Sequence, residues 1–155
     1  MPDPFNLVDP NVIDWINSRS LLLAKAINET TLKALREILR DGYTKGESIA
    51  TLTKQISDYF PESEKYRAER IARSEIIAAN NAGTLDRYKD EGVGKKEWMA
   101  ALDERTRDTH RDADGQVVGI NDYFVVGNDR MQAPGQGSDP SENINCRCTI
   151  LARLD

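Results

Sequence analysis

Hydrophobic positions in the first part of the chain recur at the three- and four-residue spacing that is typical of helices. The earliest of these are Ile13, Ile16, Leu23, Ile27, Leu35 and Ile38. This pattern predicts one long helix or two joined helices. Asp9 followed by Pro10 is a typical start, with Asp as the N-cap and Pro at the first helical position. Gly42 is placed where it would end the run.

The same spacing predicts two further helices. One runs from Glu47 to Phe60 and is ended by Pro61, and the other runs from Ser63 to Asp90, with Ser63 and Glu64 at its start. Gly83 lies inside the last helix, where glycine costs about 1 kcal/mol relative to alanine without breaking the helix.

Beyond Gly92–Gly94 the composition changes, because Gly, Pro, Asp and Asn become frequent and apolar residues fall in short runs. Trp98 is the expected core anchor of a first strand, and Asp114-Gly115 is expected to close a short helical segment. The expected strands and loop are Lys96–Leu102, Gln116–Ile120, Asp122–Val126, the loop Gly127–Ser141, and Cys146–Leu154. The sequence therefore predicts an α+β chain, with a helical part of about three helices over 1–94 and a small β-rich module over 95–155. One continuous domain is the alternative.

Charge argues against broad nucleic-acid binding, and hydropathy argues against a membrane partner. The 155 residues carry a net charge of -5, and residues 96–155 hold seven Lys and Arg against eleven Asp and Glu. Non-specific nucleic-acid affinity comes from basic residues that neutralise phosphates, so any DNA contact is expected to be local and weak. No apolar run approaches the roughly 18 residues that a membrane helix needs, so no membrane partner is expected.

One histidine and two cysteines form a candidate metal site. Imidazole and thiolate are preferred zinc ligands, and the Cys146-x-Cys148 pair could present two sulfurs to one ion beside His110. Asp103 lies seven residues before His110 and would share its face on a helix, which makes it the candidate fourth ligand. Without metal, His110 would be a hydrogen-bonded structural residue and the cysteines small buried apolar groups. Both alternatives remain open.

The same residues allow an enzymatic interpretation. His110 and Cys146 could form a catalytic dyad, with Asp103, Asp108 or Asp112 orienting the imidazole. The acidic residues of 103–114 could instead hold Mg²⁺ in a nuclease-like enzyme. No local nucleophile signature surrounds the cysteines, and arginines alternate with the acids, which favours a self-paired charged surface.

Arg67, Arg70 and Arg73 recur every three residues and lie near one face of the third expected helix. They could bind phosphate or the carboxylates of a partner protein. Pairing within the chain is the favoured alternative, and its acidic candidates are Glu64, Glu69 and Glu75.

Three segments together resemble the phage Mu F-like head-morphogenesis family, the minor head proteins of tailed phages. They are RIARSEIIAANNAG (70–83), KEWMAALDERTRDTHRDADGQVV (96–118) and NINCRCTILARL (143–154). The most specific feature is the pairing of D-x-R-T-R-x-x-H-x-x-x-D-G with a downstream N-C-R-C-T. The resemblance covers about residues 63–154.

The resemblance implies a non-catalytic virion protein present in few copies. It would associate with the portal and capsid proteins in the capsid interior and act in head morphogenesis, DNA packaging or genome delivery.

The resemblance also bears on zinc. Many relatives have C-x-x-C where this chain has Arg107 and His110, and with the C-R-C motif this looks like a four-ligand zinc site. His110, Cys146 and Cys148 match that pattern, whereas Arg107 cannot bind a metal ion.

A metal-free alternative follows from the same segment. Hydrogen bonds from Arg107 or Arg147 to Asp103 or Asp114 would hold the module together without an ion. The cofactor is therefore either none or one structural zinc ion.

Overall fold

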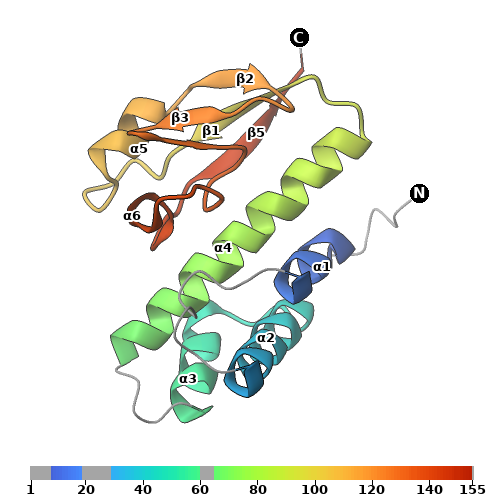
Figure 1. Cartoon of the computed structure of the whole chain (residues 1–155), viewed down its shortest axis with the longest axis vertical. Coiled ribbons are helices and arrows are strands. Elements are labelled where there is room, and N and C mark those ends of the chain that lie inside the picture. The colour runs from blue at the N-terminus through green and yellow to red at the C-terminus, as the bar shows by residue number, and fades with distance from the viewer. Residues whose placement is uncertain (1–7, 19–28, 60–64, 155) are drawn as a thin grey trace.

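The computed structural model describes residues 8–18, 29–59 and 65–154 and shows a mixed α+β chain, as the sequence predicts (Figure 1). The four long helices are α1 (Pro10–Ser18), α2 (Glu29–Thr44), α3 (Ile49–Tyr59) and α4 (Lys65–Asp90). The short elements that follow are β1 (Lys95–Met99), α5 (Asp108–Ala113), β2 (Val117–Gly119), β3 (Phe124–Val126), β4 (Asp129–Met131), α6 (Pro140–Asn143) and β5 (Thr149–Arg153).

Helix α4 joins two hydrophobic cores. Helix α4 packs with α1, α2 and α3 on one side and lies against the β-rich module on the other (Figure 1). The first core is built from Val12, Ile16, Leu35, Leu39, Leu52, Ile56, Ala68, Ile71, Ala72 and Ala79. The second is built around Trp98, Phe124, Met131 and Ile150, with Leu85 contributed by α4. Because α4 supplies side chains to both cores, it fixes the module relative to the helices.

The start of α1 agrees with the sequence, but the end of α2 does not. Asp9 accepts a hydrogen bond at Oδ1 from the Asn11 amide, 3.0 Å away, and so caps α1. The sequence predicts that Gly42 ends the first run of helical spacing, yet α2 continues through it to Thr44. A Cβ atom on Gly42 would lie 2.2 Å from Leu52 Cδ2, so this glycine allows α2 and α3 to approach each other. Gly46, at φ +67°, supplies the left-handed residue after the helix instead.

The glycine inside α4 also serves a close contact. A Cβ atom on Gly83 would lie 2.4 Å from Val12 Cγ2 of α1. The helix is continuous here, and the missing side chain lets α1 lie directly on α4. Arg87 and Asp9 form an ion pair at 3.0 Å beside this contact.

The module contains two small antiparallel sheets. The first has the strand order β2-β1-β5, with Trp98 opposite Ile150, and the second pairs β3 with β4. Trp98 is fully buried and contacts the Phe124 ring edge-on, with the ring centroids 5.3 Å apart. Its position gives the module an aromatic centre.

The sequence predicts a loop over Gly127–Ser141. Strand β4 lies within this segment, and helix α6 begins at its end. The inward position of β4 is occupied by Asp129, whose carboxylate accepts hydrogen bonds from Ser138 Oγ and the Asp139 amide. Because Asp129 occupies a position where an apolar residue is expected, the segment lacks the alternation of apolar and polar residues from which strands are predicted. The last strand is also shorter than expected, because Cys146 and Cys148 lie in the loop before β5.

Several sequence expectations fall on 19–28 and 60–64, outside the described residues. They concern Leu23, Ile27, Pro61, Ser63 and Glu64. Within the described ranges, none of the helices has both the length and the apolar character needed to cross a bilayer.

Candidate metal centre

His110, Cys146 and Cys148 meet inside the β-rich module. Helix α5 carries His110, and the loop between α6 and β5 carries both cysteines. His110 Nδ1 lies 3.3 Å from Cys148 Sγ and 3.7 Å from Cys146 Sγ. All three residues are at most 3% exposed, and one ligand atom from each lies within 4.8 Å of the other two. The sequence grouped these three residues as a candidate site, and the structure brings their ligand atoms together in the buried interior of the module.

Two polar side chains of α4 hold the cysteine loop in place. Asn81 donates from Nδ2 to the Cys148 carbonyl oxygen at 3.0 Å and to the Pro134 carbonyl oxygen at 3.4 Å. Ser74 Oγ accepts a hydrogen bond from the Asn145 amide at 2.8 Å. Asn145 has φ +58°, a left-handed conformation that asparagine tolerates better than most residues. Helix α4 therefore determines where the sulfurs lie.

The carboxylate of Glu142 faces the other side of the imidazole. Glu142 Oε2 lies 3.0 Å from His110 Nε2 and accepts a hydrogen bond from Thr109 Oγ1 at 2.9 Å. Trp98 contacts the His110 ring edge-on, with the centroids 5.6 Å apart and the planes at 88°. The imidazole is thus fixed on two sides, with Nδ1 directed at the sulfurs.

The two sulfurs differ in their electrostatics. The hydrogen bond with the Cys146 thiol, together with a smaller contribution from His110, outweighs burial and lowers the pKa of Cys148 below the usual thiol value. The pKa of Cys146 is raised by its hydrogen bond to Cys148 and by burial. Cys148 is therefore the more acidic of the two thiols.

Asp103 is placed differently from the sequence expectation. Helix α5 begins only at Asp108, so Asp103 and His110 share no helical face. The Asp103 carboxylate instead accepts from both terminal nitrogens of Arg147, from the Arg105 amide at 2.9 Å and from Thr106. The Arg147 guanidinium, with these further donors, holds the pKa of Asp103 below its usual range. The group that could hold an ion consists, within the described part of the chain, of His110 and the two cysteines.

The remaining polar residues near the site have structural contacts. Arg147 is bound to Asp103, one of the pairings considered for a metal-free module. Arg107 donates instead to the Ile144 carbonyl oxygen, and Asp114 accepts from the Ala100 amide at 2.8 Å. These bonds hold the segment before α5, the start of the cysteine loop and the end of β1 around the buried cluster.

The carboxylate that orients His110 is none of the three aspartates expected from the sequence. Asp103 is bound to Arg147, and Asp108 and Asp112 are exposed on α5. Glu142 takes that position from α6. The sequence reasoning missed Glu142, Ser74 and Asn81, because no local spacing links them to the cysteines. The Asp139-Pro140 pair, which resembles the Asp9-Pro10 helix start, could have signalled α6.

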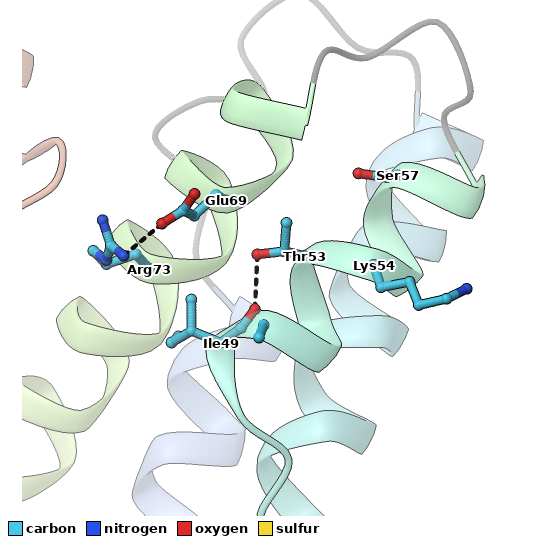
Figure 2. Close-up of a pocket in the computed structure, with 7 residues that line it drawn as sticks. Ile49, Thr53, Lys54, Ser57, Glu69 and Arg73 are labelled. Carbon is cyan, nitrogen blue, oxygen red and sulfur yellow. Dashed lines mark hydrogen bonds and ion pairs between the residues drawn. The ribbon is translucent and has the colours of Figure 1, made fainter.

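The arginine stripe lies away from this centre. Arg73 forms an ion pair with Glu69 at 2.6 Å, four residues earlier on α4, which is the intrahelical pairing that the sequence favoured. Both residues line a groove of about 620 Å³ between α3 and α4, where Thr53 donates to the Ile49 carbonyl oxygen (Figure 2). Arg67 is exposed.

Comparison with known proteins gives a family and two relatives. Residues 33–151 match the family described as Phage Mu protein F like protein. An uncharacterised protein of Haemophilus influenzae is 31% identical over 94% of this chain and 31% of its own length. The NAD(+)--arginine ADP-ribosyltransferase EFV of Enterococcus faecalis is 33% identical over 74% of this chain and 24% of its own length.

The chain thus spans less than a third of the length of these curated relatives. No solved structure matches it. The family match covers most of the chain, from α2 through the cysteine loop into β5, and it includes every residue of the buried His-Cys-Cys cluster. The chain belongs to the phage Mu protein F-like family.

Proposed function

We propose that this chain is a non-catalytic minor head protein of a tailed phage, which contacts the portal and capsid proteins and acts in head morphogenesis, DNA packaging or genome delivery. Its proposed place is the virion, in the capsid interior near the portal. The observation that carries the proposal is the family match over residues 33–151, which spans the second hydrophobic core, most of the first and the helix that joins them.

The burial of the cysteines supports a structural role over thiol catalysis. Cys146 and Cys148 are 2% and 3% exposed, and His110 is 1% exposed. A nucleophilic cysteine must reach its substrate, and reactive cysteines lie in partly exposed positions. The cluster is therefore better suited to holding the module together than to a thiol or nuclease-like reaction. The same geometry gives no specific support to transfer of ADP-ribose, the activity in the name of the Enterococcus relative.

Deletion of the gene from its parent phage tests the assembly role. The proposal predicts fewer DNA-filled, infectious particles, with the yield restored by the chain supplied from a plasmid. A normal yield of infectious particles from the deletion phage would refute it. Two assays of the purified chain test the enzymatic alternatives. Transfer of ADP-ribose would release nicotinamide from NAD⁺ in the presence of arginine, and a nuclease would cleave DNA in the presence of Mg²⁺.

We further propose that His110, Cys146 and Cys148 bind one structural zinc ion. Tetrahedral zinc, with Zn–S of about 2.3 Å and Zn–N of about 2.05 Å, requires N···S separations of about 3.6 Å. The observed separations from His110 Nδ1 are 3.3 and 3.7 Å, so the residues fit the ion. A small cavity is lined by His110, both cysteines and Asn145. The side-chain oxygen of Asn145 is buried and has no hydrogen-bond partner, so this oxygen and a water molecule are the two candidates for the fourth ligand.

Metal analysis of the purified protein tests the zinc proposal. One zinc ion per chain is expected, and Cys148→Ser should abolish its binding. The proposal fails if the wild-type chain, reduced and exposed to equimolar zinc, retains none after desalting. Intact folding of the Cys146→Ser, Cys148→Ser double variant would in addition exclude a stabilising role for the two thiols.

A further inference from the structure

We propose that Glu142 is the positioning residue of the metal centre: its carboxylate holds the proton of His110 on Nε2, so that Nδ1 presents a lone pair to the point between the two sulfurs. The role of the site as a metal centre rests on the proposed zinc binding. The statement about the imidazole concerns this chain's own residues and can be tested without metal.

The donors around Glu142 define the proton on the ring. An ionised carboxylate only accepts hydrogen bonds, and Thr109 Oγ1 already donates to Glu142 Oε2 at 2.9 Å. His110 Nε2 lies 3.0 Å from the same oxygen, so this contact is a hydrogen bond only if Nε2 carries a hydrogen. A neutral imidazole protonated at Nε2 has its lone pair on Nδ1. That lone pair faces Cys148 Sγ at 3.3 Å and Cys146 Sγ at 3.7 Å.

The same tautomer serves both states of the site. In the metal-free protein, the donor to Nδ1 is the thiol of Cys146, 3.7 Å away, because this thiol has the raised pKa and keeps its proton. In the loaded protein, the same nitrogen is a zinc ligand. Because no change of tautomer is required between the two states, the site is preorganised for the ion. Ligating histidines commonly donate their second N–H to a carboxylate, and loss of that partner typically lowers metal affinity about 10- to 100-fold.

The fold fixes Glu142 from several directions. It lies on α6, whose start is capped by Asp139 through the Ser141 amide at 2.9 Å. A Cβ atom on Gly127 would lie 2.9 Å from Glu142 Oε1 and 2.9 Å from Thr109 Cγ2, so the chain passes close to both side chains at a glycine with φ +60°. The Glu142 side chain is 13% exposed and that of His110 is 2% exposed, so water competes little for their hydrogen bond.

Nitrogen NMR on the uniformly ¹⁵N-labelled chain tests the proposal directly, because His110 is the only histidine of the sequence. In the reduced, metal-free wild-type protein at pH 8, Nε2 is expected to give the signal of a protonated ring nitrogen and Nδ1 that of an unprotonated one. The opposite assignment would overturn the proposal by itself, whether or not any variant folds.

Three variants then separate positioning from simple structural support. Glu142→Ala should mix the two tautomers and weaken zinc binding about 10- to 100-fold in competition with a chromogenic chelator. Glu142→Gln keeps an acceptor oxygen and should retain the wild-type tautomer with a smaller loss of affinity. Glu104→Ala, at an exposed glutamate, is the matched control and should change neither measurement.

The outcomes distinguish this inference from the zinc proposal. If the wild-type chain binds no zinc, the zinc proposal fails, and the tautomer of the metal-free protein still decides the role of Glu142. If the wild-type chain binds zinc and Glu142→Ala matches it in both tautomer and affinity, the positioning role is refuted and the metal site stands.

Discussion

Asn81 of α4 donates a hydrogen bond from its side-chain nitrogen to the main-chain oxygen of Cys148, 3.0 Å away and 67 residues later in the chain. Its neighbour Ser74, two helical turns earlier, accepts from the Asn145 amide. One face of one helix thus holds the loop that carries both cysteines. The helical core and the buried cluster are coupled through these two polar contacts.

Replacement of Asn81 by alanine is expected to lower the free energy of unfolding by about 1–3 kcal/mol, because it leaves buried carbonyl oxygens of Cys148 and Pro134 without their donor. Urea denaturation measures the loss. Asn80→Ala is the matched control, since Asn80 is the preceding residue on the same helix and is exposed. Equal effects of the two substitutions would show that the Asn81 bonds contribute nothing.

The contact between Gly42 and Leu52 predicts an overpacked variant. Gly42→Ala would place a methyl group 2.2 Å from Leu52 Cδ2, and forced repacking of this kind costs about 1–3 kcal/mol, despite the better helix propensity of alanine. A double-mutant cycle with Leu52→Ala measures the coupling by chemical denaturation. The second substitution should remove most of the penalty of the first. Additive effects would contradict the proposed clash.

Lys96 predicts an unusual dependence of stability on pH. The residue is fully buried on β1, donates to the Ile120 carbonyl oxygen at 2.9 Å, and lies 5.3 Å from the centre of the Phe124 ring. Burial and then the charge of Lys89 lower the pKa of Lys96 to about 8, against the opposing effect of Asp122. Between that pKa and the ordinary value of 10.5, the folded chain has released a proton that the unfolded chain still binds.

Stability relative to a Lys96→Met variant is therefore expected to rise as the pH increases from about 8 to about 10.5, by up to about 3 kcal/mol, and to change little below pH 8. Unfolding free energies of both proteins across this range provide the test. Lys45→Met, at an exposed lysine, should follow the wild-type curve. A wild-type curve that falls relative to Lys96→Met over the same range would reverse the predicted sign.

Removal of zinc is expected to destabilise the loaded protein. A ligand at 100 times its dissociation constant stabilises the folded state by about 2.7 kcal/mol, and a chelator should abolish that gain. Thermal unfolding before and after chelation measures the difference. The Cys146→Ser, Cys148→Ser variant provides the control, because its unfolding should not respond to zinc or to the chelator. An equal response of the two proteins would place the metal elsewhere.

Periodicity predicted the helical part well, because its cores use apolar residues at regular spacing. It misplaced the end of α2 for a physical reason. Glycine has two different roles here, since Gly42 permits a close helix contact and Gly46 adopts the left-handed conformation after the helix. A single sequence does not show which glycine has which role. In the module, β4 was missed because Asp129 takes an inward position and is satisfied by loop donors.

The sequence grouped the three residues of the buried cluster, but it did not indicate the residues that hold them in place. Cysteine and histidine carry recognisable chemistry, so His110, Cys146 and Cys148 could be grouped without a structure. Glu142 and Asn81 are ordinary polar residues whose roles depend on contacts between distant segments. Asp103 was assigned to the site on the assumption of a helix that begins five residues too early. Its carboxylate is used by Arg147 instead.

Protein analysis of purified, DNA-filled particles of the parent phage tests the central claim most directly. The account predicts that this chain copurifies with the particles in a few copies each, remains after external protease treatment, and is lost when the capsids are opened and stripped of their contents. Absence of the chain from particles that are fully infectious would contradict the assignment to the head.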